Sequence, residues 1–377
     1  MKVLFITAWY PTKENPISGI FVREHAKAVS IIGDEVVVIH SERSRRYIKG
    51  LYKVSEMVEE GIRTLRISYF PSPLRPLNYL FYLWGILRIS SRLLHTGFKP
   101  EVIHAHIFSA GVPAVILGRL CGIPVVITEH WHGFPQKKLN LMETLTAKMA
   151  MNHAHWILPV SRCLQKGIEA YGIKGRFEIV PNIVDTALFY PAGKEQKHNN
   201  QKKLLFVGSL SPIKGLPFLF QALAKLQKVE HNWQLDIVGD GPGRREYEHL
   251  AATLGLTGKV TFYGLKCKLE VGEFMRRADL LILPSIWENL PCVIIEAMAS
   301  GLPIISTCTG GIPEIVDQHI GVLVPPCDPD KLSEALLGMI ESLGRFDHAA
   351  ISKKADRYRP EAVGRLIHSV YERCVSG

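Results

Sequence analysis

The stretch Pro284-Ser-Ile-Trp-Glu-Asn-Leu-Pro-Cys-Val-Ile-Ile-Glu296 joins a predicted strand to a predicted helix and carries two carboxylates, Glu288 and Glu296. The preceding run 279–283, Asp-Leu-Leu-Ile-Leu, is apolar after its first residue, as a buried parallel strand should be. A proline then ends the strand, and Pro291 suits the first turn of the helix. Ligands of open α/β sheets bind at the carboxyl ends of strands, where carboxylates can accept hydrogen bonds from hydroxyl groups. We therefore expect a site for a hydroxyl-rich ligand here.

The chain of 377 residues is long enough for roughly two to three domains, and its hydrophobic fraction of 47% is ample for folded cores. Its seven cysteines are scattered without a Cys-x-x-Cys pair, so neither a disulfide framework nor a thiolate zinc site is indicated. The segment 1–7 enters a strand directly and does not resemble a secretory signal. We expect a cytoplasmic protein, with peripheral attachment to the inner face of the cytoplasmic membrane as an open alternative.

The positive charge lies in the first half of the chain. Residues 1–190 carry 23 Lys and Arg against 14 Asp and Glu (23 − 14 = +9), whereas residues 191–377 carry 22 against 21 (+1). This asymmetry fits attraction to anionic lipid or to a phosphate-bearing acceptor, although a generally solvated basic face explains it too. None of the usual nucleic-acid motifs is present, and we expect no nucleic-acid partner.

An aromatic and apolar segment, 76–94, contains Arg88 and Arg92 in its second half. Its uninterrupted apolar part is too short to span a bilayer. Two interpretations stay open: a helix that packs into the core, and an aromatic, basic helix that lies on a membrane surface.

Strands and helices alternate twice along the chain, which predicts two doubly wound parallel sheets. Expected strands are 3–8, 35–40, 102–106, 125–130 and 155–160 in the first half, and 204–207, 234–238, 260–263 and 279–283 in the second. Expected helices are 19–32, 110–121 and 141–153, then 216–226 and 244–255, with a last amphipathic helix at 360–375. A polar stretch, 193–203, reads as a linker between the halves.

Several motifs in a fixed order carry a family resemblance. They are Asn15-Pro-Ile-Ser-Gly19, His104-Ala-His106, Thr128-Glu-His130, Val160-Ser161, Pro181-Asn-Ile-Val-Asp185, Gly208-Ser-Leu-Ser-Pro-Ile-Lys-Gly215, Gly239-Asp-Gly-Pro-Gly243, Glu288 to Glu296, and Gly310-Gly-Ile-Pro-Glu314. Together they resemble the retaining, nucleotide-sugar-dependent glycosyltransferases of the GT-B fold, family 4 (glycosyl transferases group 1), over nearly the whole chain.

The resemblance implies an α/β protein of two Rossmann-like domains that face a central cleft. Residues 1–190 would bind the acceptor, 191–359 would bind the nucleotide-sugar donor, and a helix in 360–377 would cross back to the first domain. It further implies a hexosyltransferase-type enzyme of class EC 2.4, in which domain closure excludes water. Basic charge and the aromatic segment favour a sugar or lipid-linked acceptor at an anionic membrane surface, in bacterial surface polysaccharide or glycolipid assembly.

The glycine-rich loop 208–215 follows a strand and precedes a helix, so its amides can approach an anion while Lys214 supplies a positive charge to a diphosphate. Gly208 opens this predicted donor site. In the family an arginine commonly follows that glycine, but this chain has Ser209. One expected phosphate-binding cation is therefore unidentified, and an ordinary surface turn is the plain alternative.

The remaining site residues follow from the resemblance. Glu296 would bond the ribose hydroxyls, Glu288 would lie beside the donor sugar as a catalytic residue, and the amides of Asn289 and Leu290 would meet sugar or phosphate at the helix start. His130, at the end of an apolar strand, would act at the donor sugar.

Gly19 opens a helix in the first half of the chain. It resembles the family position whose backbone approaches the donor phosphate or the acceptor.

Two rival functions stay in view. The pairs His104/His106 and His130/His132 have the spacing of residues on one strand face, so a metal-dependent hydrolase is conceivable, although no carboxylate pattern accompanies them. A nucleotide-sugar epimerase of the same fold is the other. Asp328-Pro-Asp330 matches a metal motif of other sugar transferases, but helix capping explains it better. We expect neither a metal nor a cofactor, with the nucleoside-diphosphate sugar as the donor substrate.

Overall fold

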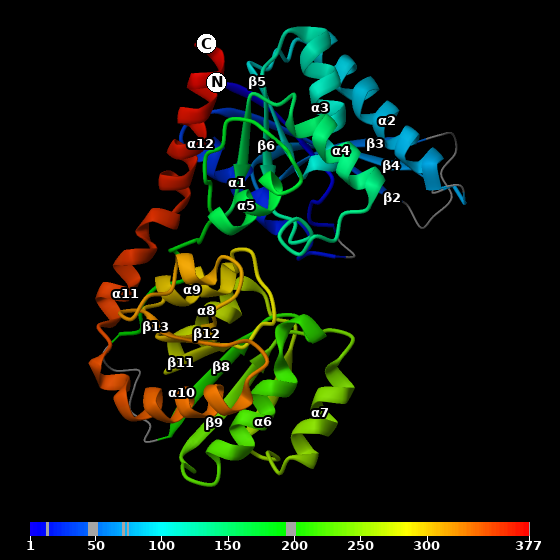
Figure 1. The fold of residues 1–377 in the computed structure, drawn as a ribbon. Helices are drawn as coiled ribbons and strands as arrows, with labels where there is room; N and C mark the ends of the chain where they lie inside the picture. Colours follow the sequence, from blue (N-terminus) through cyan, green and yellow to red (C-terminus); the bar gives the residue numbers. More distant parts are fainter. Residues whose placement is uncertain (13–14, 44–51, 70–71, 74, 194–200, 377) are drawn as a thin grey trace. The chain divides into compact units, whose positions relative to one another are not determined.

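The computed structural model describes residues 1–12, 15–43, 52–69, 72–73, 75–193 and 201–376 (Figure 1). They form two compact units, one of Met1–Ile183 with Pro360–Gly377 and one of Val184–Arg359. The sequence placed the division after residue 190, whereas the structure places it between Ile183 and Val184. Most of the expected linker, 194–200, lies outside the described residues. Among the described helices, none has the length and apolar character needed to cross a membrane.

The first unit is built on a seven-stranded sheet in the order β3-β4-β2-β1-β5-β6-β7. Its strands are β1 (Lys2–Thr7), β2 (Glu35–Arg43), β3 (Lys53–Glu59), β4 (Ile62–Tyr69), β5 (Val102–His106), β6 (Val125–Glu129) and β7 (Trp156–Pro159). Neighbouring strands are parallel except β3 and β4. The predicted parallel sheet is therefore confirmed, with an antiparallel hairpin added at one edge.

The helices of this unit, within the residues that the structure describes, are α1 (Ile20–Ile31), α2 (Arg75–His95), α3 (Phe108–Cys121), α4 (Leu141–Met151), α5 (Arg162–Glu169) and α12 (Pro360–Val375). Helix α3 packs against α2 and α4 and against the central strands, whereas α1 packs with α12 (Figure 1). The core between the sheet and the α1–α12 pair includes Phe5, Val22, Val38 and Ile367, all fully buried.

Helix α12 packs against the first unit although the whole second unit precedes it in the sequence. A Cβ atom on Gly364 would lie 2.4 Å from the carbonyl oxygen of Ala28, so only glycine allows α12 to approach α1 this closely. His368 Nδ1 lies 2.8 Å from Asp34 Oδ2, and Tyr371 Oη lies 2.5 Å from a ring nitrogen of His104. The predicted crossing helix is confirmed.

The second unit contains a six-stranded, wholly parallel sheet in the order β10-β9-β8-β11-β12-β13. The strands are β8 (Lys202–Val207), β9 (Trp233–Val238), β10 (Val260–Gly264), β11 (Leu280–Leu283), β12 (Ile304–Thr307) and β13 (Gly321–Val324). The helices are α6 (Leu216–Leu226), α7 (Arg244–Thr253), α8 (Lys268–Arg277), α9 (Cys292–Ala299), α10 (Pro329–Ser342) and α11 (His348–Lys354).

Both sheets reverse their winding direction at one point. In the first unit the order reverses between β1 and β5, and in the second between β8 and β11. Loops that leave the carboxyl ends of such a strand pair diverge and leave a crevice, which is where doubly wound folds bind ligands. The two loops at the reversal of the second unit are the glycine-rich loop 208–215 and the segment 284–291, so the fold brings the two donor motifs together.

Candidate active site

The glycine-rich loop after β8 has a backbone that other residues could not adopt. Gly215 has φ 71°, and a Cβ atom there would lie 2.0 Å from the carbonyl oxygen of Pro284. The amide of Gly208 donates to the carbonyl of Val238 at 3.0 Å. The loop is thus held against the ends of β9 and β11, and the short 3₁₀ turn Pro212–Lys214 presents the lysine.

Lys214 forms an ion pair with Glu288, and both side chains are half-buried. The hydroxyl of Ser285 donates to the same carboxylate oxygen of Glu288 at 2.8 Å. The two residues that the sequence assigned to diphosphate and sugar are therefore in direct contact, and Ser285 is an additional member of the site that sequence reasoning missed. Its hydroxyl could have been noticed three residues before Glu288 in the same loop.

A second glycine pair supports Glu288 from the other side. Gly310 has φ 55°, and a Cβ atom there would lie 1.6 Å from the carbonyl oxygen of Glu288. The amide of Gly311 donates to that carbonyl at 3.3 Å. Backbone packing on both sides therefore fixes the position of the carboxylate.

The rest of the segment lies where the sequence placed it. Asn289 and Leu290 are buried in the loop before α9, Pro291 is the N-cap residue, and Glu296 is half-buried in the helix. Ser209, which stands where the family commonly has an arginine, is hydrogen-bonded to a neighbouring serine: its Oγ lies 3.0 Å from Ser211 Oγ. Asp328 caps α10 by accepting from the amide of Lys331 at 2.9 Å, which confirms the capping interpretation of the Asp-Pro-Asp motif.

In the first unit His130 follows β6 directly and lies among aromatic rings. Its ring centroid is 4.1 Å from that of Phe21, and its Nε2 lies 3.3 Å from His106 Nδ1. Burial holds the pKa of His130 well below its ordinary value, whereas Asn182 acts to raise the pKa of His130. The imidazole is therefore neutral. A neutral imidazole can donate from one ring nitrogen and accept at the other.

Glu129 orders the loop that carries His130. Its fully buried carboxylate accepts three backbone N–H bonds, from Phe108 at 2.9 Å and from His130 and Trp131 at 2.8 Å each. Burial raises the pKa of Glu129 to about 7, while the three donors act in the opposite direction. Sequence reasoning quoted this residue in a motif without giving it a role.

The predicted histidine pairs do not form two metal sites. His104 and His106 share a strand face and stack with centroids 4.4 Å apart, but both ring nitrogens of His104 are engaged, with Tyr371 and with Thr128. His132 is exposed. Instead His25 of α1, which the sequence did not single out, joins His106 and His130, with one ring nitrogen from each within 4.8 Å of the others. Such a trio has the donor set of a zinc ligand group.

Gly19 is the N-cap residue of α1 and has φ 68°. A Cβ atom there would lie 2.4 Å from the carbonyl carbon of Trp9, so the loop after β1 and the start of α1 touch. The following amides belong to the first turn of a 12-residue helix, where an anion would be favoured.

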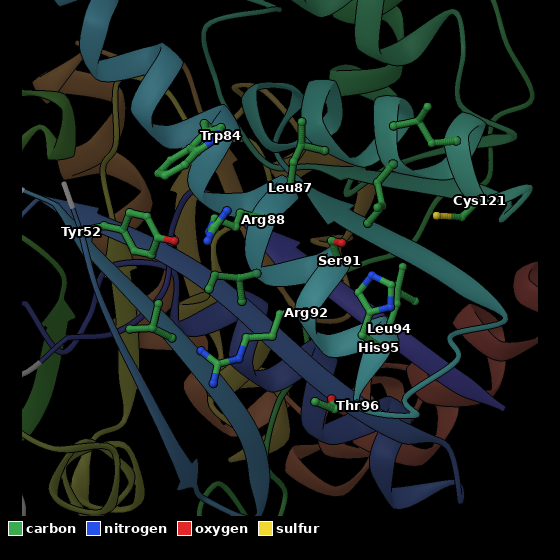
Figure 2. Close-up of a pocket in the computed structure, with 14 residues that line it drawn as sticks. Tyr52, Trp84, Leu87, Arg88, Ser91, Arg92, Leu94, His95, Thr96 and Cys121 are labelled. Carbon is green, nitrogen blue, oxygen red and sulfur yellow. The ribbon is translucent and has the colours of Figure 1, made fainter. Parts of the chain in front are cut away.

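Two of the cavities on the first unit flank helix α2. One, of about 910 Å³, is bounded by α2, the carboxyl end of α3 and the edge strand β3, with the rings of Tyr52 and Trp84 at one end and Cys121 at the other (Figure 2). The guanidinium of Arg88 lies 5.5 Å from the Trp84 ring centroid, and Arg92 also lines the cavity. The second cavity, of about 740 Å³, lies between the amino-terminal halves of α2 and α4.

Comparison with known families divides the chain as the fold does. Residues 18–188 match the family described as Glycosyltransferase Family 4, and residues 192–357 match the family described as Glycosyl transferases group 1.

Two curated relatives match nearly the full chain. A Bacillus subtilis protein named as a teichuronic acid biosynthesis glycosyltransferase, TuaC, is 27% identical over 100% of this chain and 95% of its own length. The alpha-D-kanosaminyltransferase of Streptomyces kanamyceticus is 25% identical over 85% of this chain and 90% of its own.

Solved structures agree in fold. Sucrose-phosphate synthase from Thermosynechococcus elongatus superposes with a TM-score of 0.79 at 20% identity, over 100% of both chains. HepE of Anabaena, solved in complex with UDP-glucose, gives a TM-score of 0.75 at 20% identity over 99% of this chain and 100% of that one. With both halves matched in order and both sheets of the expected kind, the chain belongs to family 4 of the GT-B glycosyltransferases, enzymes that transfer sugars.

Proposed function

We propose that the protein transfers a sugar from a nucleoside diphosphate to an acceptor hydroxyl with retention of configuration, in the assembly of a bacterial surface polysaccharide or glycolipid. The observation that carries this proposal is the Lys214–Glu288 pair at the winding reversal of the second sheet. A cation for a diphosphate and a carboxylate for sugar hydroxyls lie side by side there, in the crevice where this kind of sheet binds ligands.

The donor would occupy the second unit. Lys214 exchanges its carboxylate partner for the diphosphate, which frees Glu288 to accept hydrogen bonds from the sugar. The start of α9 adds backbone amides from Asn289 and Leu290, and Glu296 receives the ribose hydroxyls. The HepE structures that contain UDP and UDP-glucose support a uridine-type donor in a protein of this fold.

The reaction needs stabilisation of the negative charge that develops on the leaving diphosphate. Lys214 and the helix amides provide it without a metal ion. We assign no nucleophilic carboxylate, since Glu129 is fully buried and committed to three backbone donors. A same-face substitution assisted by the leaving phosphate accounts for retention, and neutral His130 contributes a hydrogen bond at the sugar.

The acceptor side would use the first unit, at Gly19 and His130. The name of the TuaC relative, which refers to teichuronic acid, supports a surface polysaccharide. Helix α2 supports a membrane-associated acceptor: its Tyr82, Ile86 and Leu93 are buried, while Tyr79 and Trp84 are exposed. One side of the helix thus packs into the unit, whereas Trp84 and Arg88 are exposed beside each other (Figure 2) and Tyr79 lines the second cavity. Exposed aromatic and basic side chains of this kind suit a membrane surface.

A thermal-shift panel of uridine, guanosine and adenosine diphosphate sugars tests the donor, because a ligand that binds the native state raises the melting temperature. Release of nucleoside diphosphate that depends on an acceptor supports transfer. Interconversion of the free nucleotide sugar without release would instead indicate an epimerase. Flotation with anionic vesicles tests the membrane assignment, and absence of binding at low salt would contradict it.

A further inference from the structure

The cavity between α2 and α4 has the dimensions of a ligand site. Its volume of about 740 Å³ falls within the range of roughly 300–1,000 Å³ that such sites occupy. Its lining includes the buried residues Ile107 and Phe108, the side chain of Trp131, and Leu80 of α2 and Met142 of α4. We refer to this cavity as the α2–α4 groove.

The polar side chains that line the α2–α4 groove are largely engaged within α4. Asn140 accepts from the amide of Glu143, and the carboxylate of Glu143 accepts from the amide of Asn140, each at 2.9 Å. The hydroxyl of Thr146 donates to the carbonyl of Met142 at 2.7 Å. A molecule in the groove would therefore meet mainly carbon atoms, which favours an apolar occupant.

The α2–α4 groove is joined to the surroundings of His130 by two short routes. Phe108 and Trp131 donate their amides to the carboxylate of Glu129, which also accepts the amide of His130. Trp9, which lines the groove, packs edge-on against Phe21 with centroids 6.2 Å apart, and Phe21 contacts the His130 ring. The side chains of Trp9 and Phe21 therefore connect the groove to the imidazole of His130, which we propose contacts the donor sugar.

The rim of the groove is apolar where it meets solvent. Leu80 is 54% exposed and Met142 is 71% exposed, and Trp9 and Tyr79 of the same cavity are partly exposed. Exposed apolar residues grouped around a cavity mark binding sites. The segment that leads into α4 carries Lys137 and Lys138, both exposed, so the chain beside the groove is basic.

We propose that the α2–α4 groove holds the apolar chain of the acceptor, so that the acceptor is a sugar or sugar phosphate carried on an acyl or isoprenoid chain. This proposal rests on the proposed function and names its acceptor class. The exposed Lys137 and Lys138 complement a phosphate between chain and sugar. A bulk membrane needs only an exposed face, whereas this cavity reaches the buried residues Ile107 and Phe108 and is linked to His130 through Trp9 and Phe21.

Binding of monoalkyl phosphates tests the proposal without knowledge of the acceptor sugar. Butyl, hexyl, octyl and dodecyl phosphate are titrated calorimetrically into the whole protein, below their micelle concentrations. We expect Kd to fall roughly two- to fourfold for each added methylene until the groove is filled, because each buried methylene contributes to transfer from water. Equal Kd values across the series would overturn the proposal.

Exposed leucine and methionine side chains on α4 provide a matched pair of variants. Met142→Asp places a charge in the groove, whereas Leu145→Asp places one on the same helix outside it, and Leu145 is 52% exposed. We expect Met142→Asp to weaken dodecyl phosphate about tenfold or more while Leu145→Asp stays within about twofold of the wild type. Leu80→Asp, which alters α2 instead of α4, should weaken dodecyl phosphate binding to the same extent as Met142→Asp. Agreement between the two would show that the loss does not come from a local distortion of α4.

An equal loss of affinity for dodecyl phosphate in Met142→Asp and Leu145→Asp would indicate that the whole exposed apolar surface docks on membranes. It would overturn the proposal that the groove binds one chain. The thermal-shift panel of nucleoside diphosphate sugars distinguishes failure of the groove proposal from failure of the proposed function. Stabilisation by a nucleotide sugar and acceptor-dependent release, combined with no chain-length dependence, would contradict the groove alone. Chain-length-dependent binding without any diphosphate release would contradict the proposed function.

Discussion

Lys214 and Glu288 form a half-buried ion pair although 74 positions separate them in the sequence. They meet because β8 and β11 are neighbours at the winding reversal of the sheet, and each residue lies in the loop beyond the carboxyl end of one of these strands. The pair places a cation and a carboxylate in contact. A diphosphate would compete with the carboxylate for the ammonium group.

Removal of the cation should therefore affect donor binding first. For Lys214→Ala we expect the affinity for nucleoside diphosphate to fall about 10- to 100-fold, since hydrogen bonds to charged groups contribute about 1.5–3 kcal/mol. Sugar transfer should be lost at ordinary donor concentrations. Titration of the diphosphate and measurement of kcat/KM check both, and full activity in this variant would sink the assignment.

The serine that replaces an expected arginine offers a gain-of-function test. Ser209 is exposed and hydrogen-bonded only locally to Ser211, so a longer side chain can be accommodated. Ser209→Arg should tighten nucleoside diphosphate binding several-fold by adding a second cation, and Ser209→Gln, of similar length without charge, should not. Equal affinities for the two variants would indicate that the loop does not contact the diphosphate.

His130→Ala tests the role of the first unit. We expect kcat to fall about 100-fold or more, in the range by which positioned acid–base or hydrogen-bonding groups contribute. The affinity for nucleoside diphosphate should stay unchanged, because the proposed diphosphate ligands belong to the second unit. A parallel loss of diphosphate affinity would show that the substitution acts on structure rather than on the sugar.

The fold was predictable to the extent that burial leaves a sequence pattern. Apolar runs such as 279–283 predicted the central strands. The expected strands include neither β3 nor β4, β12 or β13. Only β3 is polar and largely exposed, so it alone lacks an apolar run. The hairpin that follows it turns at Glu60 and Gly61, both with positive φ.

The candidate site was predictable only in part. The proposed donor residues lie in two loops that follow neighbouring strands, so the sequence indicated where they would come together. His25, Glu129 and Asn182 received no role because their importance comes from contacts between distant segments, which no local pattern records. Buried polar side chains that support a loop are therefore the part of such a site that needs coordinates.

The close approach of α12 to α1 predicts a stability effect. Gly364→Val would place side-chain atoms against the carbonyl of Ala28, where even a Cβ atom would lie at 2.4 Å. We expect the free energy of unfolding to fall by about 1–3 kcal/mol, as for other overpacked interiors. Gly344→Val, where nothing lies near the added atoms, is the matched control. Equal denaturation midpoints for the two variants would contradict the packing.

Buried neutral histidines should make the protein acid-sensitive. Burial lowers the pKa of His25 and of His40 to about 4, below the ordinary value of 6.5. Below pH 6.5 these histidines therefore bind protons in the unfolded chain but not in the native state. Their contribution to the free energy of unfolding is complete above pH 6.5 and is lost as the pH falls toward 4. Each residue can contribute roughly 3 kcal/mol over that interval.

Glu129 acts in the opposite direction. Its pKa is raised to about 7, so its contribution to the free energy of unfolding is complete below about pH 4.5 and is lost as the pH rises through 7. One carboxyl group opposes several imidazoles, because burial also holds the pKa of His104 and His106 well below 6.5. The melting temperature should thus fall steadily between pH 7 and pH 5, and His40→Gln, outside the proposed site, should flatten that slope. An unchanged slope in this variant would show that His40 is not held neutral.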